Sequence, residues 1–272
     1  MTSSQRPCSP RKARELSVKT DQFLGIDQVL IRQPASPSAV SAPPPHRESR
    51  SVGHPAAAEE SPRPVFPAPS IDVPAGGPSE DRLEHVRALH ETQCPHCSQT
   101  DSHQHIVFGE GNPDADLMFV GEAPGAEEDR TGRPFVGRAG QKLDEMIRAM
   151  GFTREEVYIA NVLKARPPDN RTPLQHEVEA CGPYLAAQTR IVQPQVIVAL
   201  GGPAAKLLLK SETGITRLRG LWGHYDDGDA QRLVMPTFHP AYLLRNPTRE
   251  VRGQVWDDLK AVLERMGRSI PG

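Results

Sequence analysis

The stretch ADLMFVGEAPGAEEDRTGRPFVGRAG, which runs from Ala115 to Gly140, organises the rest of the chain. It begins with the apolar run Leu117 to Val120, and the turn-forming segment GEAPG follows directly. This pattern predicts a buried strand that ends in a loop. The loop carries four acidic residues, Glu122, Glu127, Glu128 and Asp129. Because ligands of parallel sheets bind beyond the carboxyl ends of the strands, the loop is a candidate site, although a solvated turn has the same composition.

Three more apolar runs resemble the first in length and setting. They cover residues 157–163, 195–200 and 233–238, and apolar residues at helical spacing predict helices over 137–150, 172–191, 201–209 and 249–266. Strands that alternate with helices favour a parallel sheet with helices on both faces. We therefore expect an α/β fold, a three-layer αβα sandwich with a central four-stranded parallel sheet.

The first 80 residues differ from the rest in composition. They hold half of the 28 prolines, and Ser, Ala and Pro dominate from Pro34 to Pro78. Such a segment has too little apolar surface to offset the entropy that it would lose on ordering. We expect a disordered tail over residues 1–80, with an apolar island at 23–31 as a candidate partner-binding segment, and one folded domain over residues 81–268.

Charge and cysteine content limit the class of protein. The net charge is only -2, so any DNA-binding surface must be a local patch. No apolar run approaches the roughly 18 residues that span a bilayer, and the N-terminus lacks the apolar centre of a signal peptide. We expect a cytoplasmic protein without membrane contact, whose four cysteines are thiols or metal ligands rather than disulfides.

Two further features point to chemistry. Cys94 and Cys97 form a C-x-x-C motif, whose thiolates chelate zinc or iron-sulfur iron, form a redox pair, or are two unremarkable thiols. Asn161 lies inside the apolar run 157–163. A buried amide is costly unless it is paired, so Asn161 is either satisfied by neighbouring backbone or held for a ligand.

Two long motifs, in order, resemble those of the uracil-DNA glycosylase superfamily. GEAPGAEEDRTGRPFVGRAG is similar to the first active-site motif of the family 4 enzymes of bacteria and archaea, which carry an iron-sulfur cluster. HPAYLLR, from His239 to Arg245, is similar to the second. The resemblance covers about Cys94 to Met266. It implies a monofunctional glycosylase that flips uracil out of single- or double-stranded DNA and hydrolyses its N-glycosidic bond, which initiates base excision repair.

The resemblance also implies roles for individual residues. His239 would donate a hydrogen bond to the charge that develops on uracil O2, and Asn161 would read the amide-like edge of the base. Phe135 would stack beneath the flipped base, and Glu128 would crowd its C5 edge and so exclude thymine.

For residues in two regions, the sequence leaves two possible roles open. Glu122 is the candidate for orienting the attacking water, with pinning of the loop as its other role, and Ala123 stands where the best-known branch of the superfamily has an aspartate. Leu244 and Arg245 would press into the duplex where the base has left, or would pack on the last helix instead.

A 4Fe-4S cluster is implied as well, with Cys94, Cys97 and Cys181 as ligands. Family 4 enzymes carry another cysteine in a KCRPP sequence, and Ala165 stands in its place here. A cluster with one ligand that is not a thiolate and a lost cluster both stay open. The nearby histidines considered as substitutes are His103, His105 and His176.

Two other functional classes compete with the glycosylase. A non-catalytic DNA-binding relative would not need Glu122, Phe135, Asn161 and His239 together, and all four are present. An iron-sulfur redox protein predicts a complete cysteine set, and the set is incomplete. We expect a monomer whose tail contacts a repair or replication partner.

Overall fold

The structure, a computed structural model, describes residues 71–97 and 103–271. Most of the predicted tail, with its apolar island, lies outside these residues. Ile71 is buried against the core, and the first helix, α2 (Ser79–Gln93), begins just ahead of the predicted domain start at 81. The folded part of the chain therefore reaches at least to Ile71.

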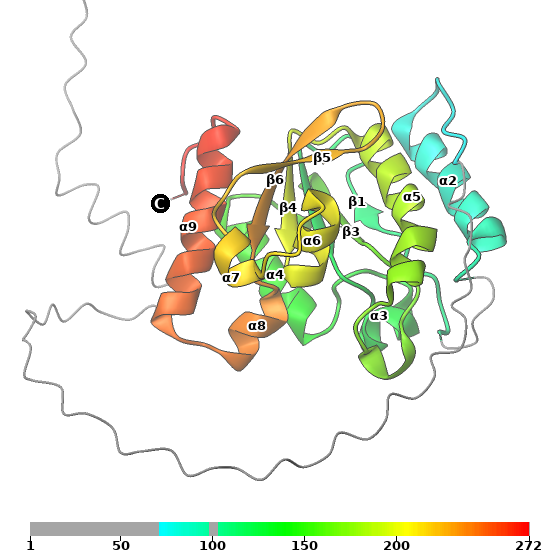
Figure 1. Cartoon of the computed structure of the whole chain (residues 1–272). Coiled ribbons are helices and arrows are strands. Elements are labelled where there is room, and N and C mark those ends of the chain that lie inside the picture. Colours follow the sequence, from blue (N-terminus) through cyan, green and yellow to red (C-terminus); the bar gives the residue numbers. More distant parts are fainter. Residues whose placement is uncertain (1–70, 98–102, 272) are drawn as a thin grey trace, which may run out of the picture.

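A sheet of six strands in the order β1-β3-β2-β4-β6-β5 forms the centre of the domain (Figure 1). Its four inner strands are parallel, as predicted: β3 (Tyr158–Asn161), β2 (Leu117–Gly121), β4 (Val196–Leu200) and β6 (Gln231–Thr237). The edge strands β1 (Glu110–Gly111) and β5 (Gly223–Asp226) are antiparallel to their neighbours and were not predicted. Both are short and only partly buried, so they lack the apolar run that marks the inner strands.

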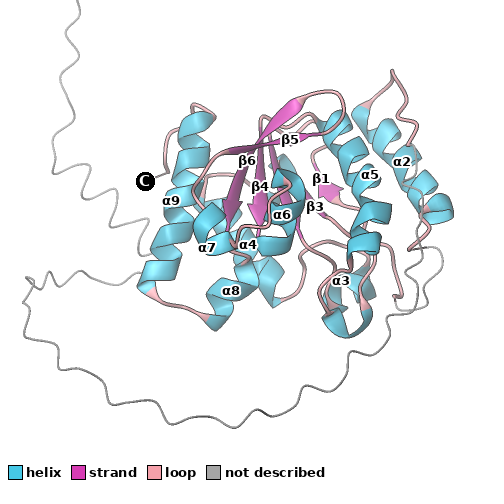
Figure 2. Cartoon of the chain, in the orientation of Figure 1, coloured by secondary structure: helices cyan, strands magenta, loops and turns pink. Residues whose placement is uncertain are grey.

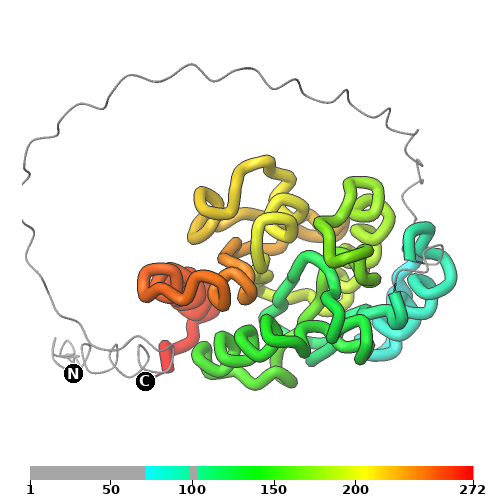
Figure 3. The backbone as a smooth tube through the Cα atoms, turned by 90° about the horizontal axis from the view of Figure 1, so that it is seen from below, coloured from blue at the N-terminus to red at the C-terminus, as the bar shows by residue number. Residues whose placement is uncertain are grey.

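Helices cover both faces of the sheet, which confirms the three-layer sandwich (Figure 2). Because side chains alternate along a strand, Met118 and Val120 pack toward one helical layer and Leu117 and Phe119 toward the other. The first layer is formed by α2, α5 (Gln175–Val192) and α6 (Gly202–Leu209), and the second by α4 (Arg138–Ala149), α8 (Pro240–Arg245) and α9 (Arg249–Arg265). In Figures 1 and 3, α2 and α9 lie at opposite ends of the domain.

Two segments outside the predicted helices form short helices. The acidic segment after β2 forms α3 (Ala126–Thr131), and the segment after His239 forms α8. In α3 the three acidic residues stand in the first turn, where the helix dipole favours negative charge. Neither segment is long enough to show the apolar periodicity of an amphipathic helix. The smaller elements are η1 (Arg154–Glu156), η2 (Pro168–Asn170) and α7 (Ile215–Leu218).

The inner strands all end at the same edge of the sheet, close to α3 and α8 at the bottom of Figure 1. Segments that are far apart in the sequence meet there, as expected for parallel strands. Among the described helices, none has the length and apolar character needed to cross a membrane.

Candidate active site and metal centre

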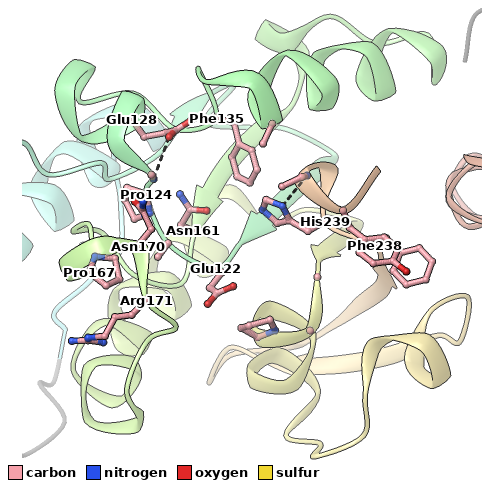
Figure 4. Close-up of a pocket in the computed structure, with 18 of the residues that line it drawn as sticks. Glu122, Pro124, Glu128, Phe135, Asn161, Pro167, Asn170, Arg171, Phe238 and His239 are labelled. Carbon is pink, nitrogen blue, oxygen red and sulfur yellow. Dashed lines mark hydrogen bonds between the residues drawn. The ribbon is translucent and has the colours of Figure 1, made fainter. Parts of the chain in front are cut away.

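A cavity of about 470 Å³ opens at the carboxyl ends of the parallel strands (Figure 4). Its volume lies within the range of small-molecule and cofactor sites. The predicted site residues that line it are Glu122, Ala123, Glu128, Phe135, Asn161, His239 and Arg245. They come from the ends of β2 and β3, from α3, from the turn before α4 and from the segment after β6. The structure thus brings together residues from three separate parts of the sequence.

Phe135 forms one wall of the cavity in an unusual backbone conformation. Its φ is +50°, which costs roughly 1–3 kcal/mol for a residue with a side chain and persists only where neighbours enforce it. Arg154 enforces it, since its guanidinium donates hydrogen bonds to the carbonyls of Pro134 and Phe135. Gly140 leaves room for the turn, because a Cβ there would lie 2.0 Å from the Phe135 carbonyl oxygen.

Glu128 holds the same turn from the other side. One carboxylate oxygen accepts hydrogen bonds from the amides of Val136 and Gly137, each at 2.9 Å, and the other accepts from Gly125 at 3.1 Å. The carboxylate therefore fixes the loop after β2 to the turn before α4. The loop-pinning role that the sequence offered as an alternative for Glu122 is filled by Glu128.

Asn161 ends β3 with its side-chain amide facing the cavity (Figure 4). Its amide oxygen is buried and has no hydrogen-bond partner within the described structure. A buried acceptor without a partner costs about 1–3 kcal/mol, so neighbouring backbone does not satisfy this group. Gly121 on β2 keeps the space open, since a Cβ there would lie 2.4 Å from the Asn161 oxygen and 2.5 Å from the Phe135 ring.

His239 faces Phe135 across the cavity, with the ring centroids 5.7 Å apart. Its Nδ1 accepts a hydrogen bond from the Ala241 amide at 3.1 Å, which places the proton of the neutral ring on Nε2. Burial, supported by the charge of Arg245, lowers the pKa of His239 to about 4. The imidazole is therefore neutral at physiological pH and presents an N–H donor. Gly201 permits this approach, since its φ is +90° and a Cβ would lie 3.0 Å from that of His239.

Glu122 stands at the end of β2 and points into the same cavity (Figure 4). Burial raises the pKa of its carboxyl group. Ala123 beside it contributes a small apolar surface to the lining. A partly buried carboxylate between Asn161 and His239 is suited to hold a water molecule or to accept a proton.

Leu244 and Arg245 lie on α8 and differ in their surroundings. Arg245 lines the cavity, whereas Leu244 is 42% exposed and borders a separate shallow hollow between α8 and α9. Leu244 is thus one of the exposed large apolar side chains on the described surface, next in sequence to Arg245, which lines the cavity.

The three predicted cysteine ligands gather on the far side of β3, between α2 and α5. The Sγ atom of Cys181 lies 3.7 Å from that of Cys94 and 3.4 Å from that of Cys97. His90 joins them, and the ligand atoms of all four residues lie within 4.8 Å of one another. Three thiols and an imidazole, all buried, are a donor set that binds zinc or iron-sulfur iron, so these residues fit a metal centre with four protein ligands.

The thiols influence each other's protonation. The hydrogen bond with Cys181 lowers the pKa of Cys94, while the hydrogen bond with Cys181 raises the pKa of Cys97 and the hydrogen bond with Cys94 raises that of Cys181 to about 12. One thiol of the group thus loses its proton most readily, and the thiolate is the form that binds metal.

Lys164 connects this cysteine group to the cavity. Its buried Nζ donates to the Asn161 carbonyl at 2.7 Å and to the Gln188 side chain of α5 at 2.5 Å. Burial lowers the pKa of Lys164 to about 7. Asn161 is therefore anchored through its backbone to the helix that carries Cys181.

Three residues of these sites were missed by the sequence analysis, namely Arg154, Lys164 and His90. Arg154 bonds to the carbonyls of Pro134 and Phe135, and Lys164 bonds to the side chain of Gln188. These partners are about 20 residues away in the sequence, so no local sequence pattern predicts the contacts. His90 had a signal, because it precedes Cys94 by one helical turn, but the histidines considered all follow the C-x-x-C motif. One of those, His105, bonds its ring to the carbonyl of Asp129 instead.

Comparison with known proteins agrees with this geometry. Residues 108–260 match the family described as the uracil DNA glycosylase superfamily. The chain is similar to the type-4 uracil-DNA glycosylase of Thermotoga maritima, with 50% identity over 171 residues that cover 62% of this chain and 85% of the relative. The type-4 uracil-DNA glycosylases of Sulfurisphaera tokodaii (40% identity, 68% and 84% covered) and Archaeoglobus fulgidus (41%, 65% and 90%) are also similar.

Proposed function

The chain belongs to the uracil DNA glycosylase superfamily, and on that premise we propose how its residues excise uracil from DNA. The enzyme hydrolyses the N-glycosyl bond between uracil and deoxyribose and leaves an abasic site for repair. The observation that carries the assignment of roles is the unpaired amide oxygen of Asn161, buried in a cavity whose opposite walls are Phe135 and His239.

Recognition of the base rests on Asn161 and Phe135. The Asn161 oxygen accepts a hydrogen bond from uracil N3–H, and its amide nitrogen donates to O4. Cytosine presents the reverse pattern at these two atoms, so it leaves the amide mispaired. Phe135, held by Arg154, provides the surface on which the flipped base stacks, and this cavity accepts the base only after it has left the duplex.

Exclusion of thymine is assigned to the rigid wall that Glu128 forms. Its three hydrogen bonds to backbone amides prevent the side chain from withdrawing, so the C5-methyl group of thymine meets a fixed obstacle. Ala123 completes this part of the lining.

Bond cleavage depends on stabilising an anion. The glycosyl bond breaks to give an oxocarbenium-like sugar and a uracil anion, so the largest gain comes from donors placed where charge develops. The neutral imidazole of His239 donates its Nε2–H to uracil O2, and its hydrogen bond from Ala241 keeps that donor aimed at the cavity. Glu122 orients the water that attacks the sugar, and its raised pKa suits it to accept a proton.

Duplex substrates require a side chain to occupy the space that the base leaves. We assign this role to Leu244, which is exposed on α8, and to Arg245, which lines the cavity. Inserted side chains offset part of the few kcal/mol that base extrusion costs.

The metal centre is assigned a structural role. Cys94, Cys97 and Cys181 would hold a 4Fe-4S cluster of the kind that the family 4 resemblance implies. Such a cluster would tie α2 to α5, and Lys164 carries that order to Asn161. A monomeric state, a cytoplasmic location and a partner for the N-terminal tail stay predictions.

Release of free uracil tests the proposed function. A duplex oligonucleotide with a single uracil should yield free uracil and an alkali-labile abasic site, whereas the same duplex with cytosine or thymine at that position should remain intact. Well-folded protein that releases no uracil from duplex or single strand would contradict the assignment.

A further inference from the structure

His90 is a buried imidazole beside the three thiols of the cysteine group. Its exposure is 0%, and neither ring nitrogen meets hydrogen-bond geometry with a partner in the described structure, although the ring lies close enough to Cys94 to add to the effect of Cys181 in lowering the pKa of that thiol. Buried polar groups in folded proteins almost always have partners, and a buried group without one costs about 1–3 kcal/mol. The two nitrogens of His90 therefore indicate that a group is bound here.

The position of His90 is that of a side chain that binds a metal. It lies four residues before Cys94 near the end of α2, and its ligand atom is within 4.8 Å of the sulfurs of Cys94, Cys97 and Cys181. Its ring also meets the edge of Tyr184, with centroids 4.7 Å apart. That contact accounts for the packing of the ring, but it involves neither ring nitrogen in a hydrogen bond.

We propose that His90 is the fourth ligand of the metal centre. It would replace the cysteine that family 4 enzymes carry at the position of Ala165, whose side chain has no donor atom. The inference rests on the proposed function only for the identity of the bound group. Ala165 is fully buried, so an alanine there leaves one ligand to be supplied from elsewhere. The neighbouring His96 is also buried, but its Nε2 faces Glu177 at 3.7 Å.

Two bound groups share this ligand chemistry. A cluster takes each ligand on a different iron, whereas a single tetrahedral ion with bonds of about 2.3 Å separates its sulfurs by about 3.8 Å. The sulfurs of Cys181 and its partners are 3.4 and 3.7 Å apart, so a lone zinc ion suits the same donors. Metal and sulfide analysis distinguishes the two groups.

Replacing a thiolate by a neutral imidazole also changes the charge of the site. With three thiolates instead of four, a cluster carries one negative charge less, and its reduction potential rises. His90→Cys restores the fourth thiolate on the same helix position and should lower the potential again.

The test compares full-length protein purified without air in four forms. These are the wild type, His90→Ala, His90→Cys and, as a matched control on the exposed side of the same helix, His85→Ala. The wild type and the control should contain about four irons with equal sulfide. After one-electron reduction of the cluster with dithionite, pulsed electron paramagnetic resonance should detect a directly bound nitrogen in both, and labelling histidine with ¹⁵N should change that signal.

The variants separate a ligand from a packing residue. His90→Ala should lose most of the metal, whereas His90→Cys should retain it, lose the nitrogen signal and show a lower potential. A nitrogen signal that persists in His90→Cys, or full metal with an unchanged spectrum in His90→Ala, would overturn the proposal. If His90→Ala does not fold, the comparison of wild type with His90→Cys decides alone.

Other outcomes distinguish this inference from the proposed function. One zinc per chain, lost in His90→Ala and kept in His90→Cys, would confirm His90 as a ligand and overturn the cluster assignment. Metal-free wild type that still releases uracil would overturn the inference and leave the glycosylase intact.

Discussion

His239 combines two properties that anion stabilisation requires. Its ring is neutral because burial lowers its pKa to about 4, and its proton is directed into the cavity because the Ala241 amide occupies Nδ1. A neutral donor gains strength as charge builds on the base, so its contribution belongs to the transition state and not to binding. Both properties follow from the short turn between β6 and α8.

Replacement of His239 by alanine should therefore lower the single-turnover rate by about 100- to 1,000-fold while the affinity for uracil-containing DNA changes little. His224→Ala is the control, since His224 is exposed on β5 and outside the cavity. Rate and affinity that fall together would show that His239 acts in binding.

The pH dependence of the rate follows from the same environment. Because the folded pKa of His239 is lowered to about 4, the ring stays neutral as the pH falls through the usual histidine range near 6.5. The single-turnover rate should show no inflection there. The acidic decline should come from protonation of Glu122, whose pKa burial raises, and Glu122→Gln should abolish it. An inflection near pH 6.5 that disappears in His239→Ala would contradict the neutral donor.

At the scale of elements, the turn between α3 and α4 stores strain and is held on both sides. Glu128 accepts three backbone hydrogen bonds on one side, and Arg154 donates to two carbonyls on the other while it pairs with Glu110 and Asp144. Phe135 is thus positioned before the base arrives, which reduces the ordering cost of binding.

Arg154→Met should release the turn and lower the excision rate by roughly 10-fold, equivalent to about 1.4 kcal/mol. Arg133→Met is a matched control, because Arg133 pairs with the same Glu110 carboxylate at 2.8 Å but is 61% exposed. Thermal denaturation of both variants separates stability from positioning. Equal excision rates in the two variants would remove the supporting role of Arg154.

The elements that could be predicted from sequence are those with a strong local pattern. The runs at β2 and β4 are apolar throughout because both faces of these strands are covered, and they were found within a residue or two. The prediction of a loop over α3 is wrong, and it failed because six residues with three acids show no apolar periodicity. Motifs identified the cavity residues, whereas Arg154, Lys164 and His90 became visible only through contacts between elements.

At the scale of the whole molecule, two sites share the segment from Asn161 to Ala165. Asn161 faces the cavity, Lys164 bonds to its carbonyl, and Ala165 is buried with the cysteine group. The cysteine group and the Asn161 side chain are therefore linked by the same short stretch. The helix α8 likewise has two sides with different surroundings. Arg245 lines the cavity, and Leu244 is exposed.

The exposed end of α8 should matter only where a duplex must be opened. Replacing Leu244 and Arg245 together by alanine should slow uracil excision from duplex DNA by about 10-fold more than from single strands, because only the duplex needs the gap filled. The single strand is the internal control for folding and chemistry. Equal slowing on both substrates would contradict the insertion role.

The central claim is that this cavity binds uracil and reads it through Asn161. The most direct measurement is the ratio of single-turnover excision rates for uracil and cytosine in otherwise identical single strands, determined for the wild type, Asn161→Asp and Asn170→Asp. Asn170 also lines the cavity but bonds to Arg166, so it controls for the added charge. Asn161→Asp should lower uracil excision by about 100-fold or more and reduce the ratio, because a carboxylate cannot donate to O4. Wild-type rate and selectivity in Asn161→Asp would contradict the account.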